Sequence, residues 1–199
     1  MRQPDLHQDL YDYAIGKQAS SRVENYHELI KLALTDKNYS FAKEIITCYL
    51  AGYAHNPNKH DLDGHKIVDG QQVFCEVKPT AYWGKVKLNM KCGFADFTAS
   101  RLDEYTSKNP EVLVSGFDKH RLLYCIGFKF NCQPFRDKIA QDVDKITLLR
   151  SGRRCTPAPT IAQIRRIDPT EIKRYYRADD LDQYKHAISD GVYQLLLSL

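Results

Sequence analysis

The sequence lacks the short motifs that mark several common enzyme classes. It contains no glycine-rich loop that could cradle a phosphate, no G-x-S-x-G nucleophile elbow and no H-E-x-x-H zinc motif. Its six cysteines are scattered, with no C-x-x-C pair among them. Neither a disulfide framework nor a cysteine-based zinc site is therefore expected.

Long apolar runs are also missing. No segment approaches 18 consecutive apolar residues, so no membrane span is expected. The first residues show no apolar signal-peptide core, and we therefore expect a cytoplasmic protein. With 199 residues, 43% of them hydrophobic, the chain is long enough to form one domain with a proper core.

The net charge of +4 is unevenly distributed. Residues 151–177 hold seven basic and two acidic residues, and the stretch between Glu76 and Asp96 holds no acidic residue at all. Two basic segments in a nearly neutral chain favour a polyanionic partner, although solvated basic faces would look the same. The candidate contacts are Lys85, Lys87, Lys91, Arg153, Arg154, Arg165, Arg166, Lys173 and Arg174.

Residues 60–79 place charged side chains inside strand-like sequence. Two such runs are joined by Asp69-Gly70, and Asp-Gly in this position is the strongest short signal for a β-hairpin with a two-residue loop. That loop puts Val68 opposite Gln71 and so sets the register of the whole hairpin. A bulge would shift the register by one residue.

The predicted register brings four charged side chains to one face. Asp63 falls opposite Glu76 and Asp61 opposite Lys78, and positions two apart on a strand share a face. Opposed residues have Cβ atoms about 4.5–5.5 Å apart, so the two carboxylates repel each other unless a cation lies between them. Oxygen ligands suit Mg²⁺, or Mn²⁺ as a substitute. The alternative is a solvated face on which these charges are only structural.

Asp63, followed after twelve residues by Glu76-Val77-Lys78, resembles the signature of the PD-(D/E)XK nuclease superfamily. The resemblance implies Mg²⁺-dependent hydrolysis of phosphodiester bonds, with Asp63, Glu76 and Lys78 as catalytic residues. It implies a metal held by Asp63 and Glu76, with Asp61 and the Val77 carbonyl as further ligands. Neither aspartate follows a proline as the pattern requires, so Asp61 remains the second candidate for the family aspartate.

Within the superfamily, the sequence looks most like a type II restriction endonuclease, a site-specific deoxyribonuclease of a bacterial or archaeal cell. That reading implies double-stranded DNA as substrate and a homodimer with two active sites. Lysines 85, 87 and 91 would contact phosphates, and the basic residues of 151–177 would read bases. A structure-selective resolvase or repair nuclease and a non-catalytic DNA-binding protein remain alternatives. Some families add a metal-binding glutamate from the preceding helix; here Glu44 is either that ligand or a surface residue.

The order of elements predicts an α/β protein, a central mixed β-sheet flanked by helices as in a restriction-endonuclease-like core. Apolar spacing predicts helices over 22–34, 40–54, 84–106 and 134–149, and strands over 112–117 and 122–130 in addition to the hairpin, whose second strand Pro79 helps to end.

Residues 1–150 are interpreted as the nuclease core, and 151–199 as a basic, helical C-terminal segment packed on it and contacting DNA. Helices are expected over 161–167, from Asp168 through the basic residues to 177, and over 181–198. The first two, tightly joined, weakly resemble a helix-turn-helix.

Overall fold

The computed structural model describes residues 12, 15–16, 41–58, 61–149 and 154–199. The helix expected over 22–34 and the candidate DNA contact Arg153 lie outside these residues.

Six strands form one mixed β-sheet in the order β1-β2-β3-β4-β5-β6. Strands β3 and β4 are parallel, and the other neighbouring pairs are antiparallel. The bounds are β1 Ala54–His55, β2 Gly64–Val68, β3 Gln71–Tyr82, β4 Glu111–Asp118, β5 Arg121–Lys129 and β6 Lys173–Arg177. This sheet, with helices on both faces, confirms the predicted α/β class.

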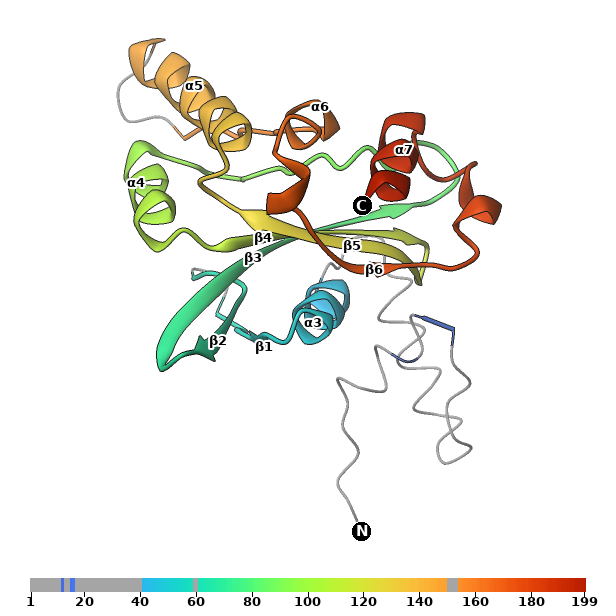
Figure 1. The fold of residues 1–199 in the computed structure, drawn as a ribbon. Helices are drawn as coiled ribbons and strands as arrows, with labels where there is room; N and C mark the ends of the chain where they lie inside the picture. Colours follow the sequence, from blue (N-terminus) through green and yellow to red (C-terminus); the bar gives the residue numbers. More distant parts are fainter. Residues whose placement is uncertain (1–11, 13–14, 17–40, 59–60, 150–153) are drawn as a thin grey trace.

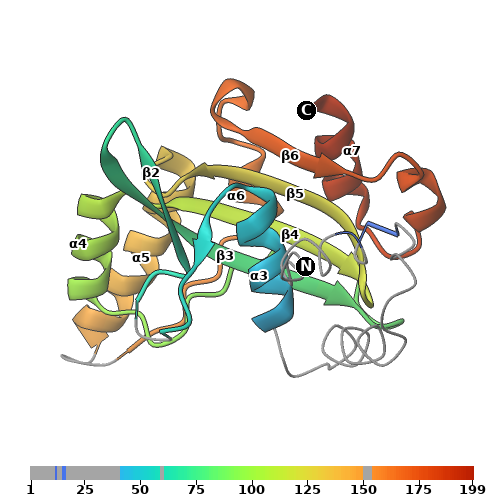
Figure 2. The ribbon, with the colours of Figure 1, turned by 90° about the horizontal axis from the view of Figure 1, so that it is seen from below.

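The helices divide between the two faces of the sheet. Figure 1 shows α3 on one side and α4, α5, α6 and α7 on the other, and Figure 2 shows α3 lying across the sheet from below. The largest apolar cluster lies between the sheet and α4–α7. Among the described residues, no helix is long and apolar enough to cross a bilayer. The bounds are α3 Phe41–Leu50, α4 Ala99–Lys108, α5 Gln133–Leu149, α6 Ile161–Ile164 and α7 Asp190–Ser198.

The β2–β3 hairpin has the predicted register. Asp69 (φ 50°) and Gly70 (φ 77°) both adopt the left-handed backbone that a two-residue type I′ loop requires. Val68 pairs with Gln71, and the ladder continues without a bulge to Gly64 and Cys75. The count from sequence is therefore correct as far as the ladder runs.

Strand β3 continues past Pro79 to Tyr82, so the prediction that this proline helps to end the strand is wrong. The backbone N–H of Val77 points to the β2 side of the strand, where it reaches Asp63. The nitrogen of Pro79, two residues on, faces the same way. Because β2 pairs no further than Cys75, the missing N–H costs the sheet no hydrogen bond there, and β3 pairs with β4 on its other side.

The connection from β3 to β4 contains α4, because parallel neighbours need a crossover. The helix predicted over 84–106 is too long: α4 begins only at Ala99, after the Thr98 side chain caps its first turn. The preceding segment is extended, with Gly84, Met90 and Asp96 at positive φ. Its backbone forms hydrogen bonds to residues 155–161 and 187–189 of the C-terminal region. In a helix, the same backbone groups would bond to each other instead.

The C-terminal region contains less helix than predicted. Residues Lys173–Arg177 form the edge strand β6, paired with β5, so the expected basic helix and the helix-turn-helix likeness are both wrong. Asp168 does cap a turn as expected, but the turn is a 3₁₀ helix that ends at Glu171. The last predicted helix is split into a 3₁₀ turn, Leu181–Tyr184, and α7. Lys173 and Arg174 are exposed, and Tyr175, Tyr176 and Arg177 are partly buried. Pairing with β5 therefore identifies this segment as a strand, whereas its exposure pattern does not alternate.

Candidate active site

A cleft of about 180 Å³ lies between the β2–β3 hairpin and α4. Its hairpin wall consists of Asp61, Asp63, Glu76 and Lys78, the four residues that the register count places on one face. Its other wall comes from the segment before α4 and from α4 itself, namely Phe94, Ala95, Phe97, Arg101 and Tyr105. One carboxylate-rich cavity therefore gathers every charged residue of the predicted hairpin site.

Glu76 is the most buried acid of this cleft, with 7% of its surface exposed. Its Oε1 accepts a hydrogen bond from Lys78 Nζ at 2.5 Å, and its Oε2 accepts one from the Tyr105 hydroxyl at 2.8 Å. Lys78 also lies over the ring of Phe94, at 4.3 Å from its centre. Burial disfavours the charge of Lys78, but Glu76 and Asp63 outweigh this effect and raise its pKa, so Lys78 is an ammonium ion.

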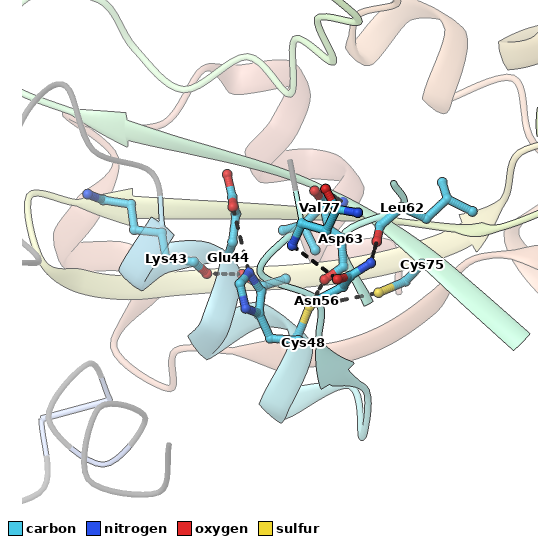
Figure 3. A network of polar contacts seen from close by, with 11 residues as sticks. Lys43, Glu44, Cys48, Asn56, Leu62, Asp63, Cys75 and Val77 are labelled. Atoms are coloured by element: carbon cyan, nitrogen blue, oxygen red, sulfur yellow. Dashed lines mark hydrogen bonds and ion pairs between the residues drawn. The ribbon is translucent and has the colours of Figure 1, made fainter. Parts of the chain in front are cut away.

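Asp63 is held at the point where the two strands separate (Figure 3). Its Oδ2 accepts a hydrogen bond of 2.7 Å from the Val77 N–H, so the carboxylate replaces the strand carbonyl that β2 no longer provides. Its backbone oxygen accepts bonds from Asn56 N at 2.7 Å and from Cys48 Sγ at 3.7 Å. The backbone of Asp63 is thus held by α3 and by the residue that follows β1, and its side chain is held by β3.

Gly64 allows this close approach. A Cβ atom at this position would lie 2.9 Å from Cys75 Sγ and 3.0 Å from Cys48 Sγ. The two cysteines are free thiols with sulfurs 3.8 Å apart, packed between α3 and β3. The absence of a side chain at Gly64 therefore lets β2 start close to the Cys48 side chain of α3 and the Cys75 side chain of β3.

The electrostatics of Asp63 are those of a site that attracts a cation. Burial first, and then the negative charge of Glu76, raise its pKa to about 7, while the Val77 N–H and Lys78 oppose the rise. Two acids that share one lysine in a half-buried cleft leave negative charge uncompensated when both are ionised. A bound cation would relieve that repulsion.

Glu44 belongs to the surroundings of this site. It lies on α3, its side chain is 22% exposed, and its Oε2 is 3.9 Å from His55 Nε2 (Figure 3). Its charge is close enough to raise the pKa of Asp63 further. It is therefore half-buried on the side of α3 that approaches Asp63, although it does not line the cleft itself.

The donor set fits Mg²⁺ held by two carboxylates. Within the described ranges, no three side chains of histidine, cysteine, aspartate or glutamate come together as a metal-binding group. Asp61 is exposed, and its Oδ2 accepts a bond of 2.7 Å from Asn58, so it lies at the mouth of the cleft apart from the inner pair. Mg²⁺ is commonly bound through one or two carboxylates while it keeps several waters. The inner pair, Asp63 and Glu76, meets that requirement.

The predicted DNA contacts fall into two groups. Lys85, Lys87 and Lys91 are exposed on the same extended segment that brings Phe94 into the cleft. Arg154 is brought beside it, because Cys155 pairs with Phe97 and Arg154 lies 3.8 Å from Asp96.

The remaining basic residues lie in two places. Arg165 and Arg166 follow α6, which begins beside the same extended segment because Ile161 N donates to Asn89 O. Lys173 and Arg174 lie on β6, away from the cleft. Two strands separate β6 from β3, a distance across the sheet of about 14 Å at roughly 4.8 Å per strand. The sequence segment 151–177 therefore does not form one basic patch around the cleft.

Two residues of α4 complete the cleft and were not predicted. Tyr105 donates its hydrogen bond to Glu76, and Arg101 lies one helical turn before it on the same face of α4. A signal for them is the polar character of this helix: it covers the sheet, yet only Tyr105 among its ten residues is buried.

Comparison with known proteins adds no relative to this picture. No protein-family model matches the sequence, and no curated protein matches it. The geometry of the cleft therefore carries the functional argument.

Proposed function

We propose that this protein is a Mg²⁺-dependent endonuclease that hydrolyses phosphodiester bonds of double-stranded DNA, of the PD-(D/E)XK type and most like a type II restriction enzyme. The observation that carries the proposal is the convergence of Asp63, Glu76 and Lys78 in one cleft. The leading helix α3, the motif hairpin and the following helix α4 also stand in the order that the resemblance implies.

The residues of the chain divide the work. Asp63 and Glu76 would hold the metal, which when bound lowers the pKa of a water and polarises the phosphate. Lys78 keeps its proton beside Glu76 and supplies positive charge where a nucleophile approaches phosphorus. Tyr105 fixes the orientation of the Glu76 carboxylate. Arg101, at the wall of the cleft, would contact the non-bridging phosphate oxygens, as arginine does well.

The wider contacts follow from the same assignment. Lys85, Lys87, Lys91 and Arg154 are exposed near the cleft and would contact the DNA backbone, which positions the substrate without reading its sequence. A cut through both strands implies two active sites and therefore a homodimer. We propose this activity for a cytoplasmic enzyme of a bacterial or archaeal restriction system.

The decisive experiment incubates the protein with phage DNA in Mg²⁺ and, in parallel, in EDTA. Discrete fragments that appear only with Mg²⁺ are the expected result. Lys78→Ala should abolish cutting while duplex binding persists. A matched control is Lys66→Ala: Lys66 is a half-buried lysine on the other face of the hairpin, 4.0 Å from Glu111, and its loss should leave cutting intact. Cutting by Lys78→Ala at the wild-type rate would contradict the site.

The alternatives give different products on the same substrates. A structure-selective resolvase would leave plain duplex intact and cut only branched junctions. A non-catalytic DNA-binding protein would retard duplex in a gel but release no fragments in Mg²⁺.

A further inference from the structure

The end of the β2–β3 hairpin projects from the sheet as a two-stranded ribbon (Figure 1). Strand β1 pairs only with Gly64 and His65, and β4 begins to pair only at Cys75. Residues 66–73 are consequently paired only with each other, and Phe74 pairs only with His65. The arm from residue 66 to residue 68 is about 10 Å long at roughly 3.3 Å per residue, before the turn is counted.

The ribbon carries an unusual pair of side chains on the face that it shares with Glu76. Ile67 and Gln72 are cross-strand partners, so they lie side by side on that face. Ile67 is 66% exposed, among the largest exposed fractions of a large apolar residue in the described chain, and Gln72 is exposed as well. Single exposed apolar residues are common on protein surfaces, so the exposure of Ile67 alone indicates no partner. The pair is distinguished by its position, because both side chains lie on the face of the hairpin that carries Glu76.

The same face leads directly to the cleft. A second hollow of about 300 Å³ runs from Gln72 past Phe74 and Lys108 to Asp61, and Asp61 also lines the catalytic cleft. Lys108, at the end of α4, lies over the Phe74 ring at 5.4 Å from its centre and is exposed. A ligand that follows this face of the hairpin would therefore pass from the ribbon tip to the carboxylates.

We propose that the ribbon of residues 66–74 enters the major groove of duplex DNA beside the cut and reads an A·T pair with Gln72 and Ile67. This inference rests on the proposed nuclease function and names the specificity element that the basic segment 151–177 was expected to supply. The major groove is about 12 Å wide and 8.5 Å deep and admits a two-stranded β-ribbon. A glutamine pairs with adenine N6 and N7, and an aliphatic side chain packs on the thymine methyl, so this cross-strand pair matches both bases.

The test is a sequence selection. A pool of duplexes with a randomised central segment is bound by the protein in EDTA and sequenced, and the same pool is cut in Mg²⁺. Gln72→Ala should lose the preference for A·T at one position by about 5- to 150-fold and leave the other positions unchanged. Ile67→Ala should weaken the same position, and Gln72→Glu should shift it toward cytosine, which donates from N4.

The ribbon supplies its own matched controls. Gln71 and Val68 are cross-strand partners one step nearer the turn, on the opposite face, and both are exposed. Gln71→Ala and Val68→Ala should keep the wild-type preference. All four positions lie at the surface, and thermal melting would confirm that each variant is folded.

Three results would overturn the proposal: unchanged preference in both Gln72→Ala and Ile67→Ala, an equal loss at every base position, or a change of oligomeric mass in Ile67→Ala without a change of preference. The last would assign the ribbon to a contact between copies of the chain. If the protein selects a sequence through Gln72 but never cuts, the nuclease function fails while the ribbon proposal stands. If the protein cuts DNA and the Gln72 and Ile67 variants keep the wild-type sequence preference, the ribbon proposal fails while the nuclease function stands.

Discussion

Two buried glutamates lie on opposite faces of the same sheet, and they differ in what surrounds them. Glu76 on β3 is 7% exposed and Glu111 on β4 is 9% exposed. Glu111 pairs with Cys75, the residue before Glu76, so the two glutamate side chains point to opposite faces. Both carboxylates use both oxygens. Glu111 accepts from Tyr53 at 2.6 Å and Tyr175 at 2.7 Å, whereas Glu76 accepts from Tyr105 and from the ammonium of Lys78.

Under the proposed function, this difference separates a structural glutamate, Glu111, from a catalytic one, Glu76. Two neutral hydroxyl groups donate to the oxygens of Glu111. Lys66, which lines the same hollow, keeps its ammonium nitrogen 4.0 Å from Oε2 of Glu111. Glu76 instead shares a cleft with a second acid, Asp63, whose pKa burial and Glu76 raise to about 7. Burial is similar for the two glutamates, so the case for a functional role of Glu76 depends on the second carboxylate beside it.

The largest expected effect is on cleavage by the paired variants Glu76→Gln and Glu111→Gln. If the proposed function holds, loss of the Glu76 charge removes a metal ligand. Metal assistance provides several kcal/mol of transition-state stabilisation, so kcat should then fall by at least about 10³-fold. Glu111→Gln should cut at nearly the wild-type rate, although it unfolds more easily. Rates measured on phage DNA at saturating Mg²⁺ check both, and a similar loss in the two variants would erase the distinction drawn between the faces.

A smaller effect is expected from the tyrosines that orient the two glutamates. Tyr105→Phe leaves Oε2 of Glu76 without its donor, and loss of such a supporting contact typically costs 10- to 100-fold in activity or metal affinity, so cutting should slow by about that factor. Tyr175→Phe should leave cutting unchanged and lower the free energy of unfolding by about 1.5–3 kcal/mol, because a hydrogen bond to a charged group is lost. Urea denaturation of both variants distinguishes an orienting tyrosine from a purely structural one.

The hairpin could be predicted because its information is local. An Asp-Gly turn sets the register, and two-residue periodicity then determines which side chains share a face, so the four cleft residues follow from counting. The α4 side of the cleft could not be predicted in this way. The segment before α4 is extended because its backbone bonds to residues 155–161, which are at least 58 positions away in the sequence, and no local pattern contains that pairing.

The basic C-terminal residues show the same limit. The segment from Asp168 to residue 177 begins with a good capping signal and has helix-compatible side chains, yet Lys173–Arg177 form the edge strand β6 beside β5. Pairing with an existing strand edge outweighs weak helical preference. Charge counted along the sequence therefore overstated how much of it reaches the cleft.

The smallest expected effect is on the free energy of unfolding, and it comes from the charge of the Asp63 carboxylate beside Glu76. The pKa of Asp63 is raised from its ordinary 3.8 to about 7 in the folded chain, so between these values the native state binds more protons than the unfolded state. Its contribution therefore lowers the free energy of unfolding as pH rises from about 4 to 7, and the loss is complete above that range.

Asp63→Asn removes this penalty while its amide oxygen still accepts from Val77 N–H. Without metal, the variant should match the wild type near pH 4 and be more stable by about 1–2 kcal/mol at pH 8. This difference is smaller than the full pKa shift would give, because solvent screens the partly exposed carboxylate. If Asp63 holds the metal as proposed, saturating Mg²⁺ should reverse the order, because an ion that binds only the native state stabilises it and the variant lacks one of the proposed metal-binding groups. Urea titrations at both pH values, with Mg²⁺ and with EDTA, measure all four differences. If Asp63→Asn is less stable than the wild type at pH 8 in EDTA, this face of the sheet does not carry uncompensated negative charge. The reason for expecting a cation beside Asp63 would then be lost.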